Sequence, residues 1–91
     1  MILNLDEVKL YLRIDGDEEN TLITKLILTA EDLVEGIIRY PLSEFQEVPE
    51  AIRQAILYAV ANMFEHRETF QIKEIINTMI NLVFSYRKEE W

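Results

Sequence analysis

Apolar residues recur at intervals of three and four along most of the chain, the spacing that places them on one face of an α-helix. In the longest such stretch, from about Glu18 to Arg39, they cover an arc wide enough to pack against two neighbouring helices. The alternation of apolar and polar residues that marks a half-buried strand does not occur in the sequence. The pattern predicts an all-α fold, a small bundle of about four helices, one short at the N-terminus and three longer.

Residues that favour helix ends mark the boundaries of the first two helices. Asn4 is a good N-cap for the short first helix, and the segment Asp15-Gly16-Asp17 should break it. Asp15 followed by Glu18 forms a capping-box pattern for the second helix, with the aspartate at 17 as a competing N-cap. That helix should end at Tyr40, because the proline at 41 disfavours the helical conformation in the residue before it.

The third helix is expected from about Pro49 to Phe64 and is unusually apolar. From Ala51 onward its only formal charge is Arg53. A helix this apolar lies either at the centre of the core or against another chain. Three residues of the preceding loop should tuck inward: Leu42, Phe45 and Val48. The fourth helix should carry a regular apolar stripe of Ile72, Ile75, Ile76, Met79, Ile80 and Val83.

The chain has 91 residues, so we expect a single domain spanning residues 1–91. A domain of this size buries only roughly 60–65% of its unfolded surface, which leaves a thin margin of stability. Disulfides cannot widen that margin because the sequence has no cysteine. Contacts with partner subunits remain as a possible source of added stability.

The formal net charge of −8 lies entirely in the first half of the chain. Residues 1–50 carry 12 acids and 4 bases, whereas residues 51–91 carry 5 of each. Such a surface repels phosphate backbones and anionic membranes, so we expect neither tight nucleic-acid binding nor membrane binding. No apolar run approaches the ~20 residues that span a bilayer, and the N-terminus lacks the features of a signal peptide. Synthesis and folding in a cytoplasm are therefore expected.

No pattern of reactive side chains indicates catalysis or a cofactor. The single histidine, His66, excludes histidine pairs, and we expect it at a helix end. The acids from Asp15 onward resemble the start of a calcium loop, but the sixth and twelfth positions would be Asn20 and Leu26 rather than glycine and glutamate. The glutamates at 31, 35, 65 and 68 are better explained as a solvated acidic face than as a metal site. We therefore expect no catalytic, cofactor-binding or metal-binding residues and no enzymatic activity.

Several short stretches occur in an order that resembles a known family. In chain order they are Leu5–Asp15, Asp17-Glu18-Glu19, Leu22-Ile23, Ala30-Glu31, Val48–Ile52, Gln54-Ala55-Ile56, Arg67-Glu68 and Tyr86-Arg87. Each stretch alone is a weak signature, but the ordered set covers essentially the whole chain. The set is similar to the small head-tail connector, or DNA-packaging adaptor, proteins of tailed bacteriophages.

The resemblance implies a structural virion protein at the head-tail junction, made in the cytoplasm of a bacterial host. Such subunits form a ring beneath the portal protein at the capsid vertex. The ring extends the DNA channel, helps retain packaged DNA and offers a docking surface for the next connector or tail protein. The implied partners are further copies of this chain, the portal protein, and the downstream connector or tail protein. DNA would pass through the ring without sequence-specific binding.

Three groups of residues receive roles as hypotheses. A ring needs a heterologous interface, in which different patches of neighbouring subunits meet. Candidates for this interface are Leu28, Leu57, Tyr58, Ala61, Arg67 and Glu68. Candidate contacts with the portal or a neighbour are Tyr86, Arg87 and Trp91, since aromatic residues and arginine dominate interface hot spots. An acidic face lining the channel is expected at Glu31, Asp32 and Glu35.

Simpler interpretations stay open for several of these residues. Leu28 is equally well explained as an ordinary exposed leucine, and the charged pair at 67 and 68 as an ion pair within one subunit. The C-terminal residues could form a frayed end. For the whole chain, the alternatives are a small helical regulatory module acting as a monomer or dimer, and an enzyme accessory or weak metal-dependent hydrolase.

Overall fold

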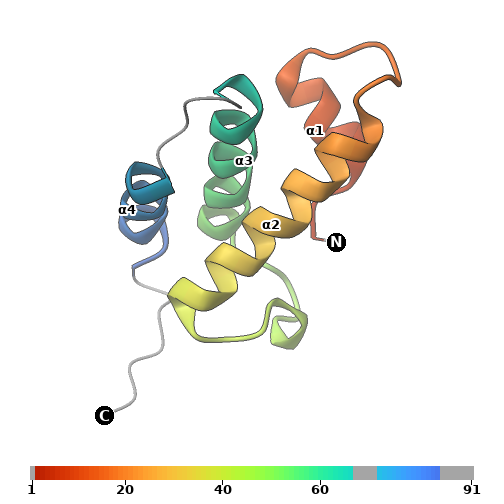
Figure 1. Ribbon diagram of the computed structural model, residues 1–91. Helices are drawn as coiled ribbons and strands as arrows, with labels where there is room; N and C mark the ends of the chain where they lie inside the picture. The colour runs from red at the N-terminus through yellow and green to blue at the C-terminus, as the bar shows by residue number, and fades with distance from the viewer. Residues whose placement is uncertain (1, 67–71, 85–91) are drawn as a thin grey trace.

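The computed structural model describes residues 2–66 and 72–84. Within these ranges the chain forms four α-helices and one short 3-10 helix, with no strand. They are α1 (Leu5–Leu12), α2 (Asn20–Ile38), η1 (Leu42–Glu44), α3 (Glu50–Glu65) and α4 (Ile72–Val83). The all-α prediction, with one short helix followed by three longer ones, is confirmed (Figure 1).

Helix α3 lies in the middle of the fold, with α2 on one side and α4 on the other (Figure 1). Helix α1 packs against α2 and α3 at the opposite side of the molecule from α4. This arrangement explains why α3 is so apolar, because two neighbours cover it. Its fully buried residues are Ile52, Ala55, Ile56, Ala59 and Val60. They meet the buried stripe of α2, formed by Ile23, Ile27, Ala30, Val34 and Ile38, and that of α4, formed by Ile75, Met79 and Val83.

Helix α1 begins as expected and ends earlier than expected. The Asn4 side chain accepts a hydrogen bond from the backbone N–H of Glu7 at 2.7 Å, which satisfies one of the free donors of the first turn. The helix then stops at Leu12, before the predicted break at residues 15–17. Arg13 takes the left-handed conformation (φ 61°, ψ 45°), and Ile14 donates its N–H to Lys9 O at 2.9 Å. This closure turns Ile14 back onto the core without glycine.

The capping box expected at the start of α2 does not form, so that prediction is wrong. The helix begins at Asn20, after Glu19, and has no side-chain cap. The Asp17 carboxylate instead accepts hydrogen bonds from Lys9 Nζ at 2.8 Å and from Asn20 Nδ2 at 3.2 Å. Lys9 is only 8% exposed, and a buried ammonium group requires a charged or polar partner. The ion pair with Lys9 therefore fixes the direction of the Asp17 side chain.

The segment between α2 and α3 is folded inward, as predicted. Leu42 is buried, and Phe45 and Val48 pack against the core. The 3-10 turn of η1 was not predicted. It is held by Glu35, whose carboxylate accepts the backbone N–H of Leu42 at 2.7 Å. The rings of Tyr40 and Phe45 meet edge to face, with centroids 4.9 Å apart.

The contact between Lys9 and Asp17 should make stability depend on pH. Hydrogen bonding to Lys9, and next to Asn20, lowers the pKa of Asp17 below its ordinary value. A carboxyl group whose pKa is lowered by folding adds stability at pH values above its unfolded pKa. That stability is lost as the pH falls through the folded pKa. We therefore expect Asp17→Asn to have a lower melting temperature than the wild type above about pH 4. The difference between the two melting temperatures should become smaller at lower pH.

Thermal melting between pH 2 and pH 7 measures this gap. Asp15→Asn is the matched control, because this exposed neighbour has no ion pair with any described residue. A gap of constant size for Asp17→Asn across the whole range would show that its charge plays no part.

Candidate subunit interface

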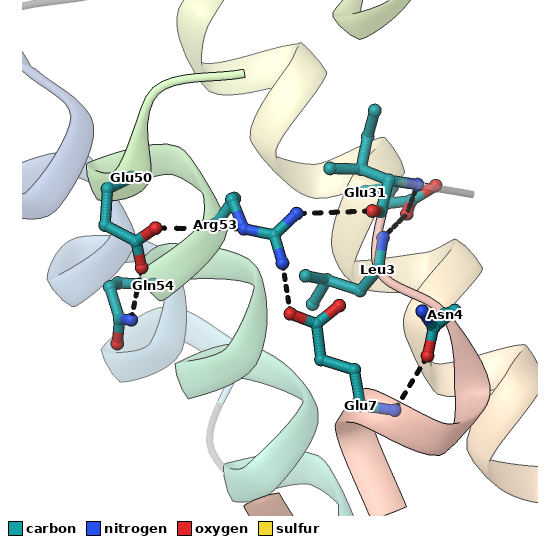
Figure 2. Close-up of polar contacts among 8 residues, drawn as sticks. Leu3, Asn4, Glu7, Glu31, Glu50, Arg53 and Gln54 are labelled. Atoms are coloured by element: carbon teal, nitrogen blue, oxygen red, sulfur yellow. Dashed lines mark hydrogen bonds and ion pairs between the residues drawn. The ribbon is translucent and has the colours of Figure 1, made fainter. Parts of the chain in front are cut away.

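The segment before α1 is held to the rest of the fold by polar contacts that the sequence did not reveal. One oxygen of Glu31 on α2 accepts the backbone N–H of Ile2 at 2.6 Å and that of Leu3 at 3.4 Å. Arg53 on α3 donates Nη1 to the carbonyl oxygen of Ile2 at 3.4 Å (Figure 2). Leu3 is thereby placed fully inside the core. The N-terminal segment is thus bonded to both α2 and α3.

Arg53, the one charge that stood out in the third helix, joins three elements. Its Nη2 donates to the carboxylate of Glu7 on α1, and its Nε lies 3.8 Å from Glu50 Oε1 one turn earlier on α3 (Figure 2). The side chain of Arg53 is half-buried, so its charge needs these partners. Arg53 thus connects α1, α3 and the N-terminal segment at a single point.

Two grooves flank the N-terminal segment, and Ile2 lines both. The larger, of about 570 Å³, lies toward α3 and is lined by Ile2, Glu47, Val48, Pro49, Glu50 and Arg53. The smaller, of about 260 Å³, lies along α2 and is lined by Ile2, Leu28, Glu31, Asp32, Glu35, Leu42 and Ser43. We call the smaller one the α2 groove. It combines three apolar side chains with three carboxylates.

The acidic face predicted at Glu31, Asp32 and Glu35 is not simply solvated. Glu31 holds the N-terminal segment and Glu35 holds η1, so both carboxylates have backbone partners within the subunit. Asp32 is exposed, and no described residue pairs with it. The acidic channel face at these three residues stays a prediction, with two of its carboxylates bonded within the subunit. Their side chains are drawn inward because buried backbone N–H groups require acceptors.

The contact residues predicted from the sequence, for the subunit interface and for the portal or a neighbour, fall into four groups. Leu28 is exposed, at 48%, as expected. Leu57 was expected at the subunit surface, but this placement is wrong. It is only 7% exposed, because α4 and α2 cover both sides of α3, so little of it is left for a partner. Tyr58 and Ala61 are half-buried. Arg67, Glu68, Tyr86, Arg87 and Trp91 lie outside the described residues.

Large exposed hydrophobic residues gather instead on the two outermost helices. On α1 they are Leu10, which is 81% exposed, and Tyr11. On and just after α4 they are Ile72, Leu82 and Phe84, the last 60% exposed. These two helices lie on opposite sides of the fold (Figure 1). The two surfaces therefore suit a head-to-tail contact between copies, in which different patches meet.

A sequence signal for these surfaces existed and was missed. Leu10 falls out of phase with the buried stripe of α1, in which Val8 is fully covered. On the C-terminal side, residues 72, 76, 80 and 84 are all apolar and four apart, which aligns them along one edge of a helix. The first and last are exposed and the middle two half-buried. An apolar ridge that continues beyond the buried face indicates a surface for another protein.

Residues 2–66 and 72–84 contain neither a metal-binding cluster nor a membrane-spanning helix. No group of three or more histidine, cysteine, aspartate or glutamate residues within these ranges could hold a metal ion. No helix in the same part of the chain is both long enough and apolar enough to cross a membrane. His66 is exposed and lies at the C-terminal end of α3, the position expected for it.

Comparison with known proteins identifies the family. No curated protein and no solved structure gives a significant match. The family described as phage gp6-like head-tail connector protein matches residues 2–89, nearly the full length of the chain. The match includes all four α-helices and the two exposed apolar surfaces on α1 and α4. The chain therefore belongs to the phage gp6-like head-tail connector family, whose members are structural proteins of the phage virion.

Proposed function

We propose that this connector subunit forms a ring beneath the portal protein. The ring would extend the DNA channel, help retain the packaged genome and present a docking surface for the next connector or tail protein. The family match over residues 2–89 carries this proposal. Synthesis in the bacterial host cytoplasm and a single domain over residues 1–91 form part of it.

The distribution of exposed apolar residues supports a ring. A closed ring of identical subunits uses a heterologous interface, so each subunit must offer two different patches. Here α1 offers Leu10 and Tyr11, and the α4 side offers Ile72 and Phe84, which lie on one edge of the helix. We place the α4 surface of one subunit against the α1 surface of the next. The contact would cover apolar side chains that one subunit leaves in water.

Native mass measurement and negative-stain imaging across a concentration series test the proposal. We expect a closed ring of many copies, with the purified chain alone or after its portal protein is added. Leu10→Ser and Ile72→Ser should leave the melting temperature unchanged, since both side chains are exposed. Each should raise the concentration needed for assembly by about tenfold, the effect of losing one interface contact worth ~1.4 kcal/mol.

Leu10→Met is the matched control, because it keeps an apolar side chain at the same place and should assemble normally. A chain that stays monomeric or dimeric at every concentration, also with the portal protein present, would contradict the ring. It would favour the small binding module instead. Equal assembly of Leu10→Ser and the wild type would contradict the role given to α1.

The proposed acidic lining of the channel needs a more selective test than charge reversal of the whole trio. Reversing the charge of Glu31 or Glu35 would also release backbone groups that these residues hold. Asp32→Lys changes the charge alone. If Asp32 faces the channel, the lysine should attract DNA and slow its ejection.

A further inference from the structure

The α2 groove is lined by residues of the N-terminal half of the chain and combines apolar with acidic side chains. Its apolar lining is Ile2, Leu28 and Leu42, and Leu28 remains half-exposed at the surface. Its acidic lining is Glu31, Asp32 and Glu35. With a volume of about 260 Å³, it suits one or two inserted side chains rather than a broad flat contact.

The three carboxylates that line the groove form no ion pair with any described residue. Glu31 and Glu35 accept hydrogen bonds from backbone N–H groups, which are neutral and leave the carboxylate charge in place. The ion pairs of the described residues join Lys9 to Asp17 and Arg53 to Glu7 and Glu50. None of them involves a carboxylate of the groove, although Arg53 also donates to the carbonyl oxygen of Ile2. A partner with apolar side chains and adjacent positive charge would therefore complement the groove.

The sequence that follows α4 has this composition. Phe84, just beyond the helix, is 60% exposed. It is followed by Ser85-Tyr86-Arg87-Lys88, so two aromatic residues within three positions precede two bases. Glu89 and Glu90 come next, which confines the complementary charge to the part nearest the aromatics. Aromatic residues and arginine are the commonest anchors of protein interfaces.

We propose that residues 84–88 of one subunit dock in the α2 groove of the next subunit. This inference rests on the proposed ring and gives it a second contact. In that ring the α4 side of one copy meets α1 of its neighbour. Ile2 lies three residues before α1 and lines the groove, so the α1 surface and the α2 groove are offered by the same neighbour. The C-terminal part of each copy donates and the acidic N-terminal half accepts, which places Asp32 at a contact between subunits.

The absence of cysteine from the chain allows a direct test by disulfide trapping. Ser43 lines the groove and Ser85 lies inside the docking segment, so Ser43→Cys and Ser85→Cys change one atom each. A disulfide forms only when the two Cα atoms come within about 7 Å. When the two full-length variants are mixed and oxidised, we expect the mixed dimer to exceed both homodimers. Thr29→Cys mixed with Ser85→Cys is the matched control, because Thr29 is exposed on α2 and does not line the groove.

Charge reversal on either side tests whether the pairing is specific. Adding Asp32→Lys to the Ser43→Cys chain should lower the yield of mixed dimer about tenfold, because like charges then meet. Adding Arg87→Glu and Lys88→Glu to the Ser85→Cys chain should also lower the yield with the unchanged Ser43→Cys chain, because the new glutamates would then face Glu31, Asp32 and Glu35. The melting temperature of each variant confirms that the subunit is still folded.

Each remaining outcome separates docking from ring formation. A yield no higher than the control would overturn the docking, and rings formed under the same conditions would leave the proposed function standing. Mixed dimer in the absence of rings would support the docking and count against the ring. A chain carrying both Ser43→Cys and Ser85→Cys that closes on itself at high dilution, with no mixed dimer from the single variants, would overturn docking between subunits.

Discussion

Ile56→Ala is expected to lower the free energy of unfolding by about 3 kcal/mol, enough to remove much of the stability of a domain of this size. Ile56 is fully buried in the middle of α3, the helix that packs against both α2 and α4. Truncation loses the burial of three carbon atoms and leaves a cavity between helices that cannot close fully. The melting temperature should fall by about 15 °C, and assembly should be lost with it.

Urea unfolding and thermal melting measure this effect. Leu10→Ala is the matched control, since Leu10 is the most exposed of the large hydrophobic residues described. Its free energy of unfolding should stay within about 0.5 kcal/mol of the wild type, although its assembly should weaken. Comparable losses of stability at both positions would contradict the arrangement of α3 between two helices.

Arg53→Met is expected to loosen α1 and the N-terminal segment from the rest of the fold. The change removes the ion pairs with Glu7 and Glu50 and the hydrogen bond to Ile2 O, while keeping a long apolar side chain. The side chains of Arg53 and Glu7 are partly open to solvent, so we expect a loss of about 1–2 kcal/mol rather than the larger penalty of a fully buried pair.

Hydrogen exchange of the backbone amides should localise this loss. Protection should fall first in α1, because Glu7 loses its link to α3. Arg39→Met is the matched control. Arg39 is exposed at the end of α2 and makes no ion pair with a described residue. If Arg53→Met lowered protection evenly over the whole fold, its role as a local junction would be contradicted.

The α2 groove depends on the contacts that hold the N-terminal segment in place. Glu31 holds Ile2 and Leu3, and Arg53 holds Ile2 from the other side. Ile2 in turn lines the α2 groove. A loosened N-terminal segment should therefore also weaken the trapping of the mixed dimer, which links fold stability to the proposed docking.

The sequence by itself determined the helices and the family. The stripes of α2, α3 and α4 follow from apolar spacing, since the residues that share a helical face are three and four apart. The start of α1 follows from Asn4, whose cap involves the residue three positions on. The order of short motifs was enough to place the chain among phage connectors, which the match over residues 2–89 confirms.

Only the tertiary structure decided which polar and apolar residues meet. Arg53 and Glu7 are 46 positions apart, and Glu31 and Ile2 are 29 apart. Such pairs depend on how the helices cross, which the pattern within one helix does not contain. Leu57 shows the same limit, because a residue on the side of an apolar stripe is buried or exposed according to where the next helix packs. Lys9 draws Asp17 away from the expected capping role because the cost of burying an unpaired charge outweighs the gain from a helix cap.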